Sequence, residues 1–166
     1  FRERMEKIAE QDARLLCWPH DPPLPSLSAT WNRALEFVWE CGGTEALVVN
    51  NDTRLASWMV ENLRAVMQGT NALFVTGVGV TAAQFAKYPQ TVDVAWQEFM
   101  DTETPWKGGP DFSCFLISKA CHEQYRFDEG LTPAFLEDLD FHRRMMLGGD
   151  GERIFSINLP YLHLGG

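Results

Sequence analysis

The sequence predicts an α/β protein built around a mostly parallel sheet that is flanked by helices. Apolar runs of strand length alternate with segments of helical periodicity along most of the chain. The connections between these runs are mostly too long for β-hairpins, which favours crossovers between parallel strands. The chain has 166 residues, of which 45% are hydrophobic. That is enough for one globular core, so we expect a single domain over residues 1–166.

The composition narrows the function classes. The chain carries 14 basic against 23 acidic residues, a net charge of −9, which argues against broad binding to nucleic acid or anionic membranes. No apolar stretch approaches the roughly 20 residues of a membrane-spanning helix, and the first residues show no secretory pattern. We therefore expect a soluble, cytoplasmic protein without a transmembrane segment. The cysteines show no zinc-type spacing and are expected to be buried, reduced thiols: Cys17, Cys41, Cys114 and Cys121.

The first third of the chain is expected to hold two helices and a strand. A charged helix over residues 1–11 leads into a short strand at 15–18, and the prolines of Asp21–Ser26 form a loop. Ser28 or Thr30 then caps a helix that Gly42-Gly43 ends. Its apolar positions follow the spacing i, i+3, i+4 and i+7: Trp31, Ala34, Leu35 and Val38.

The middle of the chain contains the two clearest strands. Ala46–Asn50 contains four consecutive apolar residues, two of them β-branched, so it is expected to be a strand buried on both faces, and a helix comes after it over residues 54–68. A second apolar run covers residues 72–80. A short helix over 81–87 and a weak edge strand over 92–96 come next.

The last third is expected to continue the alternation of strand and helix. A Gly- and Pro-rich loop over residues 102–110 precedes a buried strand at 112–117. Thr132 and Pro133 form the start of a helix that ends at Gly148-Gly149. A final strand over residues 154–157 leads to a loop that contains His163.

Three oxygen-bearing side chains come directly after the central strand: Asn50, Asn51 and Asp52. Open α/β sheets bind ligands at the carboxyl ends of their strands. A Mg²⁺ or Mn²⁺ ion prefers carboxylate, carbonyl and water oxygens, so these residues could hold one against a phosphate-bearing substrate. The alternative is an ordinary turn that caps the next helix.

The second acidic group, Glu137-Asp138-Leu139-Asp140, opens the last predicted helix. Carboxylates there are favoured by the helix dipole, which is a purely structural explanation. Asp140 also has Arg144 at i+4, the spacing of a surface ion pair. Asp138 and Glu137 have no such partner and remain available as proton acceptors.

Two further segments carry candidate site residues. His163 lies between Pro160 and Gly165-Gly166, either as a packed histidine or as a ligand. Gly108–Ser113 is either a plain loop or a place where a ligand approaches the backbone. The sequence contains no P-loop, no Gly-x-Gly-x-x-Gly and no Gly-x-Ser-x-Gly, so nothing supports those classes of site.

Taken in order, several segments resemble the family 2 glycosyltransferases of the GT-A fold, particularly the rhamnosyltransferase-like members. Their order and spacing together carry the resemblance, which covers the chain from about Ser28 to its end. Members usually begin with a strand, a helix and a second strand that have no counterpart here, so residues 1–18 would correspond to the second helix and third strand. The matching stretches are Trp31–Leu35, Leu47–Thr53, Gly109–Ser118, Phe127–Glu129, Glu137–Asp140 and His163–Gly165.

The resemblance implies a role for each matching position. Asn50-Asn51-Asp52 stands where the family has its Asp-x-Asp motif, so Asp52 would bind the metal that bridges the donor diphosphate. His163 matches a histidine that completes the metal site in some members. Asp138 would be the catalytic base, supported by Glu137 and Asp140. The remaining expected contacts are Asn50, Asn51 and Asn32 with the donor, and Gly109, Asp111, Phe112 and Ser113 with the acceptor.

These expectations combine into one functional hypothesis and two rivals. The hypothesis is an inverting glycosyltransferase that uses Mn²⁺ or Mg²⁺ to move a sugar from a nucleotide donor to a hydroxyl acceptor. The first rival is a metal-dependent nucleotidyltransferase, which the same acidic groups could serve. The second is a non-catalytic carbohydrate-binding or interaction module of the same fold.

Overall fold

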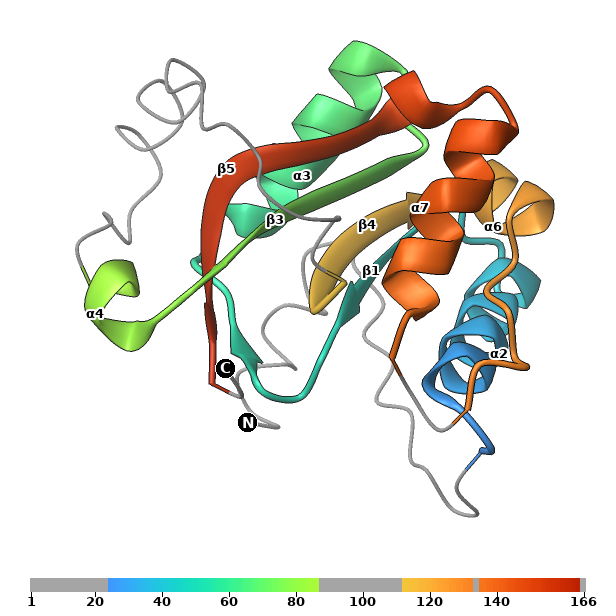
Figure 1. The fold of residues 1–166 in the computed structure, drawn as a ribbon. Helices are drawn as coiled ribbons and strands as arrows, with labels where there is room; N and C mark the ends of the chain where they lie inside the picture. The colour runs from blue at the N-terminus through green and yellow to red at the C-terminus, as the bar shows by residue number, and fades with distance from the viewer. Residues whose placement is uncertain (1–23, 87–111, 133–134, 165–166) are drawn as a thin grey trace.

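The computed structural model describes residues 24–86, 112–132 and 135–164, and Figure 1 shows how their elements are arranged. The elements expected over residues 1–18, 92–96 and 102–110 lie outside these ranges. The described residues form three layers, in which helices cover both faces of a central sheet. The α/β class is therefore confirmed.

The sheet contains five described strands in the order β1-β4-β3-β5-β2. β3 and β5 pair in parallel, whereas β1 with β4, β3 with β4, and β2 with β5 pair antiparallel. Because β1 and β3 are both antiparallel to β4, they run in the same direction as each other and as β5. The strands are β1 (Glu45–Val49), β2 (Thr53–Arg54), β3 (Phe74–Val80), β4 (Cys114–Ser118) and β5 (Ile154–His163).

The expectation of a mostly parallel sheet is thus wrong for the described pairings. β4 lies between two strands that run against it, and its first four residues are all buried. A strand buried on both faces has the same continuous apolar pattern whichever way it runs. The sequence pattern therefore identifies the strand but not its direction.

Helices on the two faces enclose separate parts of the core. α3 (Met59–Thr70) packs on one face, and α2 (Leu27–Glu40), α6 (Lys119–Gln124) and α7 (Glu137–Leu147) lie on the other (Figure 1). Side chains of β4 alternate between them, because successive residues of a strand point to opposite faces. Cys114 and Leu116 join the α3 side, whereas Phe115 and Ile117 join the other.

The ends of several elements differ from those expected. Ser26, not Ser28 or Thr30, caps α2, because its side chain accepts a hydrogen bond from the Ala29 N–H. α3 starts at Met59 because Thr53 and Arg54 pair with β5 instead of beginning a helix. α7 starts at Glu137, later than the Thr132 signal indicates.

Other elements are absent from the sequence prediction or longer than it indicates. α6 is not among the expected helices, and Ser118 caps it through the Cys121 N–H. β5 continues through Pro160 to His163, where the sequence predicts a loop. The short helix α4 (Ala82–Phe85) agrees with the expected segment and begins with a capping box.

Two expectations from composition can also be compared with the structure. In the described part of the chain, no helix combines the length and apolar character needed to cross a membrane. Cys114 and Cys121 are buried, and burial raises the pKa of the Cys121 thiol to about 12. Cys41 is exposed, so the expectation of burial is wrong for that cysteine.

Candidate functional site

Asp52 and His163 meet at one edge of the sheet although 111 positions separate them in sequence. The Asp52 Oδ2 atom lies 3.2 Å from the His163 Nε2 atom. Thr53 pairs with His163 in the β2–β5 ladder, and the Leu164 N–H donates to the Asp52 carbonyl over 2.8 Å. Backbone contacts at Asp52 and at Thr53 therefore bring these two side chains together.

The chemistry of this pair fits a divalent cation. Carboxylate oxygen and imidazole nitrogen are both common ligands of Mn²⁺ and related metals. The Asp52 Oδ1 atom is buried and has no hydrogen-bond partner among the described residues. The side chain of Asp52 is 40% exposed and that of His163 is 30% exposed, so a ligand can reach both.

No group of three or more His, Cys, Asp or Glu side chains suited to a metal is found within the described ranges. A metal here would thus need further ligands, such as substrate oxygens and water.

Asn50 and Asn51 form the turn that leads from β1 to β2. The Asn50 carbonyl accepts hydrogen bonds from the Thr53 N–H at 3.2 Å and from the Thr53 hydroxyl at 2.8 Å. Asn51 is exposed at the tip of this turn. The turn alternative is correct as local structure, but the turn leads into a strand and not into a helix, so the segment is not a helix cap.

Glu137, Asp138 and Asp140 lie in the first turn of α7. The Asp138 Oδ1 atom accepts from the Leu139 N–H at 2.7 Å. The Glu137 Oε2 atom is buried and lacks a hydrogen-bond partner in the described structure. Asp140 is paired as expected, since Arg144 Nε donates to its Oδ2 atom over 2.8 Å.

A chain of contacts relates the first turn of α7 to the end of β1. The Asn50 N–H donates to the Ser113 carbonyl over 2.9 Å, and the neighbouring Phe112 ring lies 5.6 Å from the Phe141 ring. Phe141 is one helical turn after Asp138. In Figure 1, α7 begins at the edge of the sheet where β1 and β5 end. In the described structure Asp138 makes no hydrogen bond or ion pair with Asp52 or His163.

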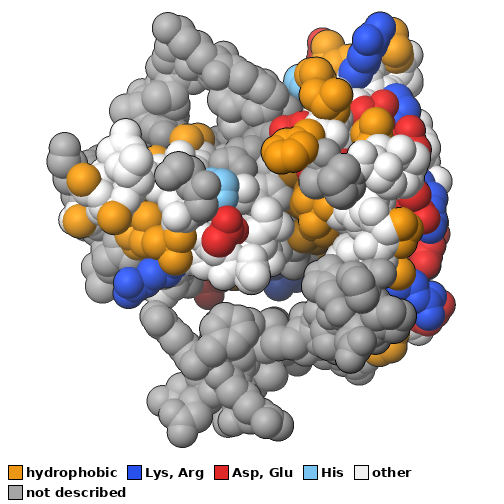
Figure 2. All heavy atoms as spheres, turned by 60° about the horizontal axis from the view of Figure 1, so that its bottom comes forward, with side chains coloured by type: hydrophobic (Ala, Val, Ile, Leu, Met, Phe, Trp, Pro, Cys, Tyr) orange, Lys and Arg blue, Asp and Glu red, His pale blue; other side chains and the backbone are white. Residues whose placement is uncertain are grey.

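The exposed face at this edge is shown in Figure 2, which is turned so that this part of the molecule comes forward. An acidic and a histidine side chain adjoin there at the surface, with hydrophobic side chains gathered to either side. A charged ligand would therefore meet both polar and apolar groups on this face.

The expected acceptor contacts are only partly described. Gly109 and Asp111 lie outside the described residues. Phe112 is 5% exposed and packs among core rings, 4.8 Å from Phe74. The ring therefore belongs to the core, and its expected contact with an acceptor stays a prediction. Ser113 is also buried, and its carbonyl holds the turn at Asn50.

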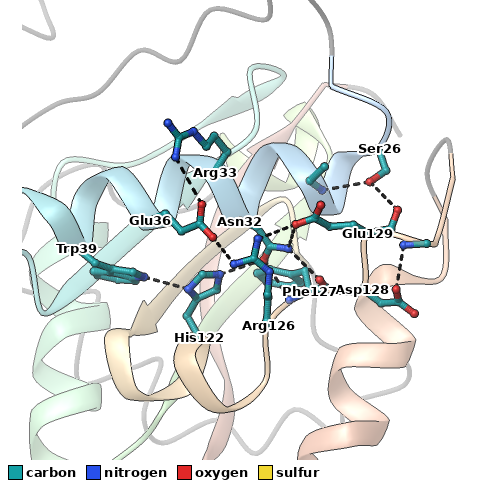
Figure 3. Close-up of polar contacts among 12 residues, drawn as sticks. Ser26, Asn32, Arg33, Glu36, Trp39, His122, Arg126, Phe127, Asp128 and Glu129 are labelled. Atoms are coloured by element: carbon teal, nitrogen blue, oxygen red, sulfur yellow. Dashed lines mark hydrogen bonds and ion pairs between the residues drawn. The ribbon is translucent and has the colours of Figure 1, made fainter.

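Asn32, which the resemblance places at the donor, lies in the interior of the protein, and its contact with a donor stays a prediction. Asn32 is fully buried on α2, and its amide uses its full hydrogen-bonding capacity inside the protein (Figure 3). Nδ2 donates over 2.8 Å to the Phe127 carbonyl and over 2.8 Å to Glu129 Oε1. Oδ1 accepts from the Phe127 N–H at 3.1 Å and lies 3.0 Å from His122 Nε2.

His122 extends this polar cluster to Trp39. The Trp39 Nε1–H donates to His122 Nδ1 over 3.0 Å, so the neutral ring carries its proton on Nε2 and donates to Asn32. Burial lowers the pKa of His122, and the nearby Arg126 guanidinium lowers it further. No sequence signal marks this cluster, because its members lie far apart in the chain on elements whose packing is not predictable from periodicity.

A surface pocket of about 530 Å³ lies between the turn after α6 and α7. Its walls carry guanidinium and carboxylate groups in equal number, which suits hydroxyl groups because these both donate and accept hydrogen bonds. The hydrogen bond from Asn32 and the Arg126 guanidinium lower the pKa of Glu129, so that carboxyl is ionised at neutral pH. The pocket is lined by Arg126, Phe127, Asp128, Glu129 and Arg144.

The fold and these side chains define an α/β protein with a mixed sheet. A carboxylate–histidine pair lies at the end of this sheet where β1 and β5 terminate. The chain matches no protein-family model, no curated protein and no solved structure.

Proposed function

We propose that this protein is an inverting glycosyltransferase with a GT-A-type domain, which transfers a sugar from a nucleotide-diphosphate donor to a hydroxyl acceptor. The observation that carries the proposal is the meeting of Asp52 and His163 at 3.2 Å. From the resemblance to family 2 glycosyltransferases, these two residues are expected in one metal site although they are distant in sequence. The orphaned Asp52 Oδ1 atom gives the same edge spare capacity for a ligand.

In the proposed reaction Asp138 acts as the general base. It removes the proton from the acceptor hydroxyl while that oxygen bonds to the anomeric carbon of the donor sugar. The bond from the anomeric carbon to the diphosphate oxygen breaks, and both electrons leave with the nucleoside diphosphate. A single displacement inverts the anomeric centre. Glu137, whose Oε2 atom is buried without a partner in the described structure, would support the base.

Asp52 and His163 would hold a Mn²⁺ or Mg²⁺ ion, which when bound supplies positive charge against the departing diphosphate. Asn50 and Asn51 lie in the same turn as Asp52 and would border the donor. The expected role of Asn50 and Asn51 is to supply polar groups near the diphosphate, and it does not depend on the role of Asp138 as the base.

The direct test is a screen of nucleotide sugars with the full chain, in Mn²⁺ or Mg²⁺, against sugar and other hydroxyl acceptors. We expect release of nucleoside diphosphate that stops when a chelator is added, and a product whose anomeric configuration is opposite to that of the donor by NMR. Release of pyrophosphate instead would support a nucleotidyltransferase. Binding of a carbohydrate without release of either product would support a non-catalytic module.

A further inference from the structure

The turn after α6, residues 126–130, is held from both sides. On one side Asn32 of α2 makes three hydrogen bonds to it: to the Phe127 carbonyl, from the Phe127 N–H and to Glu129 Oε1 (Figure 3). Ser26 adds a longer hydrogen bond to the Glu129 carbonyl at 3.4 Å. The turn is thereby fixed to α2 through a fully buried amide.

On the other side the same turn contacts α7. The Phe127 ring stacks on Phe141 with centroids 4.5 Å apart and an interplanar angle of 23°. Arg144 Nη1 donates to the Arg126 carbonyl over 2.9 Å and its Nε donates to Asp140. An apolar contact at Phe141 and a polar contact at Arg144 therefore join the turn to α7.

The first turn of α7 has little support of its own. Its N-cap residue, Leu136, has a left-handed φ of 74° and supplies no side-chain hydrogen bond to the helix. Leu136 and Leu139 are both exposed, so they do not anchor this turn in the core. The position of Asp138 must then come from the contacts that hold Phe141 and Arg144, one to two turns further along.

We propose that Asn32 is a positioning residue for Asp138: its buried amide fixes the turn at residues 126–130, and that turn fixes α7. The role of Asp138 as a base rests on the proposed function. The structural link from α2 through the turn to α7 is independent of that function. Asn32 is buried and acts through its hydrogen bonds to Phe127 and Glu129 of this turn, which contacts α7 through the Phe127 ring and the Arg126 carbonyl.

The experiment compares Asn32→Asp with Asn62→Asp in the full chain. Asn32→Asp keeps the shape of the side chain but turns both Nδ2 donors into acceptors that face the Phe127 carbonyl and the Glu129 carboxylate. Asn62 lies on α3, on the opposite face of the sheet, and its Nδ2 atom has no hydrogen-bond partner in the described part of the protein, so the same change serves as the matched control.

Amide hydrogen exchange is the first readout. In Asn32→Asp we expect exchange at residues 126–130 and 140–145 to be faster by about tenfold or more, with β3 and α3 unchanged. Unchanged exchange at residues 140–145, or faster exchange everywhere, would overturn the proposal.

If Asn32→Asp does not fold, Glu129→Gln provides the second variant. Glu129 is exposed, and the change weakens the hydrogen bonds that Asn32 and Arg126 donate to its carboxylate. In Glu129→Gln, faster exchange at residues 126–130 and 140–145, with β3 and α3 unchanged, supports the link, and unchanged exchange at residues 140–145 refutes it.

Turnover is the second readout and separates this inference from the proposed function. With the nucleotide sugar that supports turnover, Asn32→Asp should lower kcat about tenfold or more and change the donor KM less than about threefold. A loss confined to KM would overturn the positioning role. If the wild-type chain shows no turnover, the proposed function fails, whereas the exchange result still decides whether Asn32 holds α7.

Discussion

The carboxylate of Asp52 has one oxygen 3.2 Å from an imidazole and a second, buried oxygen without a hydrogen-bond partner in the described structure. Burying an unsatisfied polar group costs about 1–3 kcal/mol, a cost that a ligand bound to this oxygen would offset. Asp52 is therefore the single residue on which a ligand role is best tested.

Asp52→Asn keeps the shape of this side chain and removes its charge. Under the proposed function we expect nucleoside diphosphate release to fall at least ~100-fold, which corresponds to about 2.7 kcal/mol of transition-state stabilisation. The urea midpoint should change little, because the pair with His163 is 30–40% exposed and such pairs contribute about 0–1 kcal/mol.

Glu123→Gln is the control for that substitution. Glu123 is exposed on α6 and pairs only weakly with Lys119 at 3.7 Å. The substitution Glu123→Gln should leave both the rate of nucleoside diphosphate release and the urea midpoint unchanged. Equal rates in Asp52→Asn and wild type would remove Asp52 from the site.

His122 gives a prediction for stability against pH. Its pKa in the folded protein is below the value of about 6.5 expected when unfolded. As the pH falls below 6.5, the unfolded chain binds a proton that the folded chain does not, so the free energy of unfolding should fall between pH 7 and pH 5. The carboxyls with lowered pKa, Glu129 and Asp150, titrate below this window in the unfolded chain.

Urea unfolding at several pH values measures this effect. The decline should be largely absent in His122→Gln. A decline of the same size in His122→Gln would assign it to another group.

At the scale of elements, β3 and β5 pair around an irregularity at Gly77. The register passes from Thr76 opposite Ser156 to Val78 opposite Pro160, so the single residue Gly77 faces residues 157–159 on β5. A Cβ at Gly77 would overlap the Leu159 carbonyl oxygen. Pro160 is tolerated inside β5 because it comes directly after this irregularity, where the ladder is interrupted.

Gly77→Ala should therefore destabilise the protein by about 1–3 kcal/mol or more. Gly69→Ala is the matched control, because a Cβ at Gly69 of α3 meets no atom within 4 Å. Alanine there should stabilise by about 0.5–1 kcal/mol through helix propensity. Denaturant unfolding of both variants measures the difference, and a neutral Gly77→Ala would mean that β5 can shift away at that point.

Elements are predictable from sequence where one local signal determines them. The apolar spacing of Trp31 and Leu35 places α2, and the apolar run after Glu45 places β1. The expected burial of β1 on both faces is wrong, because Val49 is exposed. The features that sequence patterns do not predict depend on distant partners. The direction of β4, the pairing of Thr53 with His163 and the extension of β5 through Pro160 all arise from strands that lie far away in sequence.

The same distinction applies to the candidate site. Asp52 and His163 are recognisable because each comes after an apolar run, and the structure brings them together. The burial of Asn32 and Phe112, both expected at ligands, was not predictable, because residue type and position do not reveal burial. Both are instead part of the interior, where a polar amide and an aromatic ring hold elements together.

At the scale of the whole molecule, two groups of side chains lie on elements that begin or end at one edge of the sheet. Asp52 and His163 are fixed there by backbone pairing, whereas Asp138 is carried by a helix that is held through residues 126–130. The two groups do not touch in the described structure. Whether the two groups act in one reaction is therefore tested by measuring turnover.

The most direct measurement is the rate of nucleoside diphosphate release by Asp138→Asn, relative to wild type, with the best nucleotide sugar and Mn²⁺ or Mg²⁺. Glu61→Gln, at an exposed acid in the first turn of α3, is the control. We expect Asp138→Asn to fold normally and to lose about 10²–10⁴-fold in rate, the range that a general base supplies. Glu61→Gln should keep most of its rate. Release by Asp138→Asn at the wild-type rate would contradict the proposed mechanism.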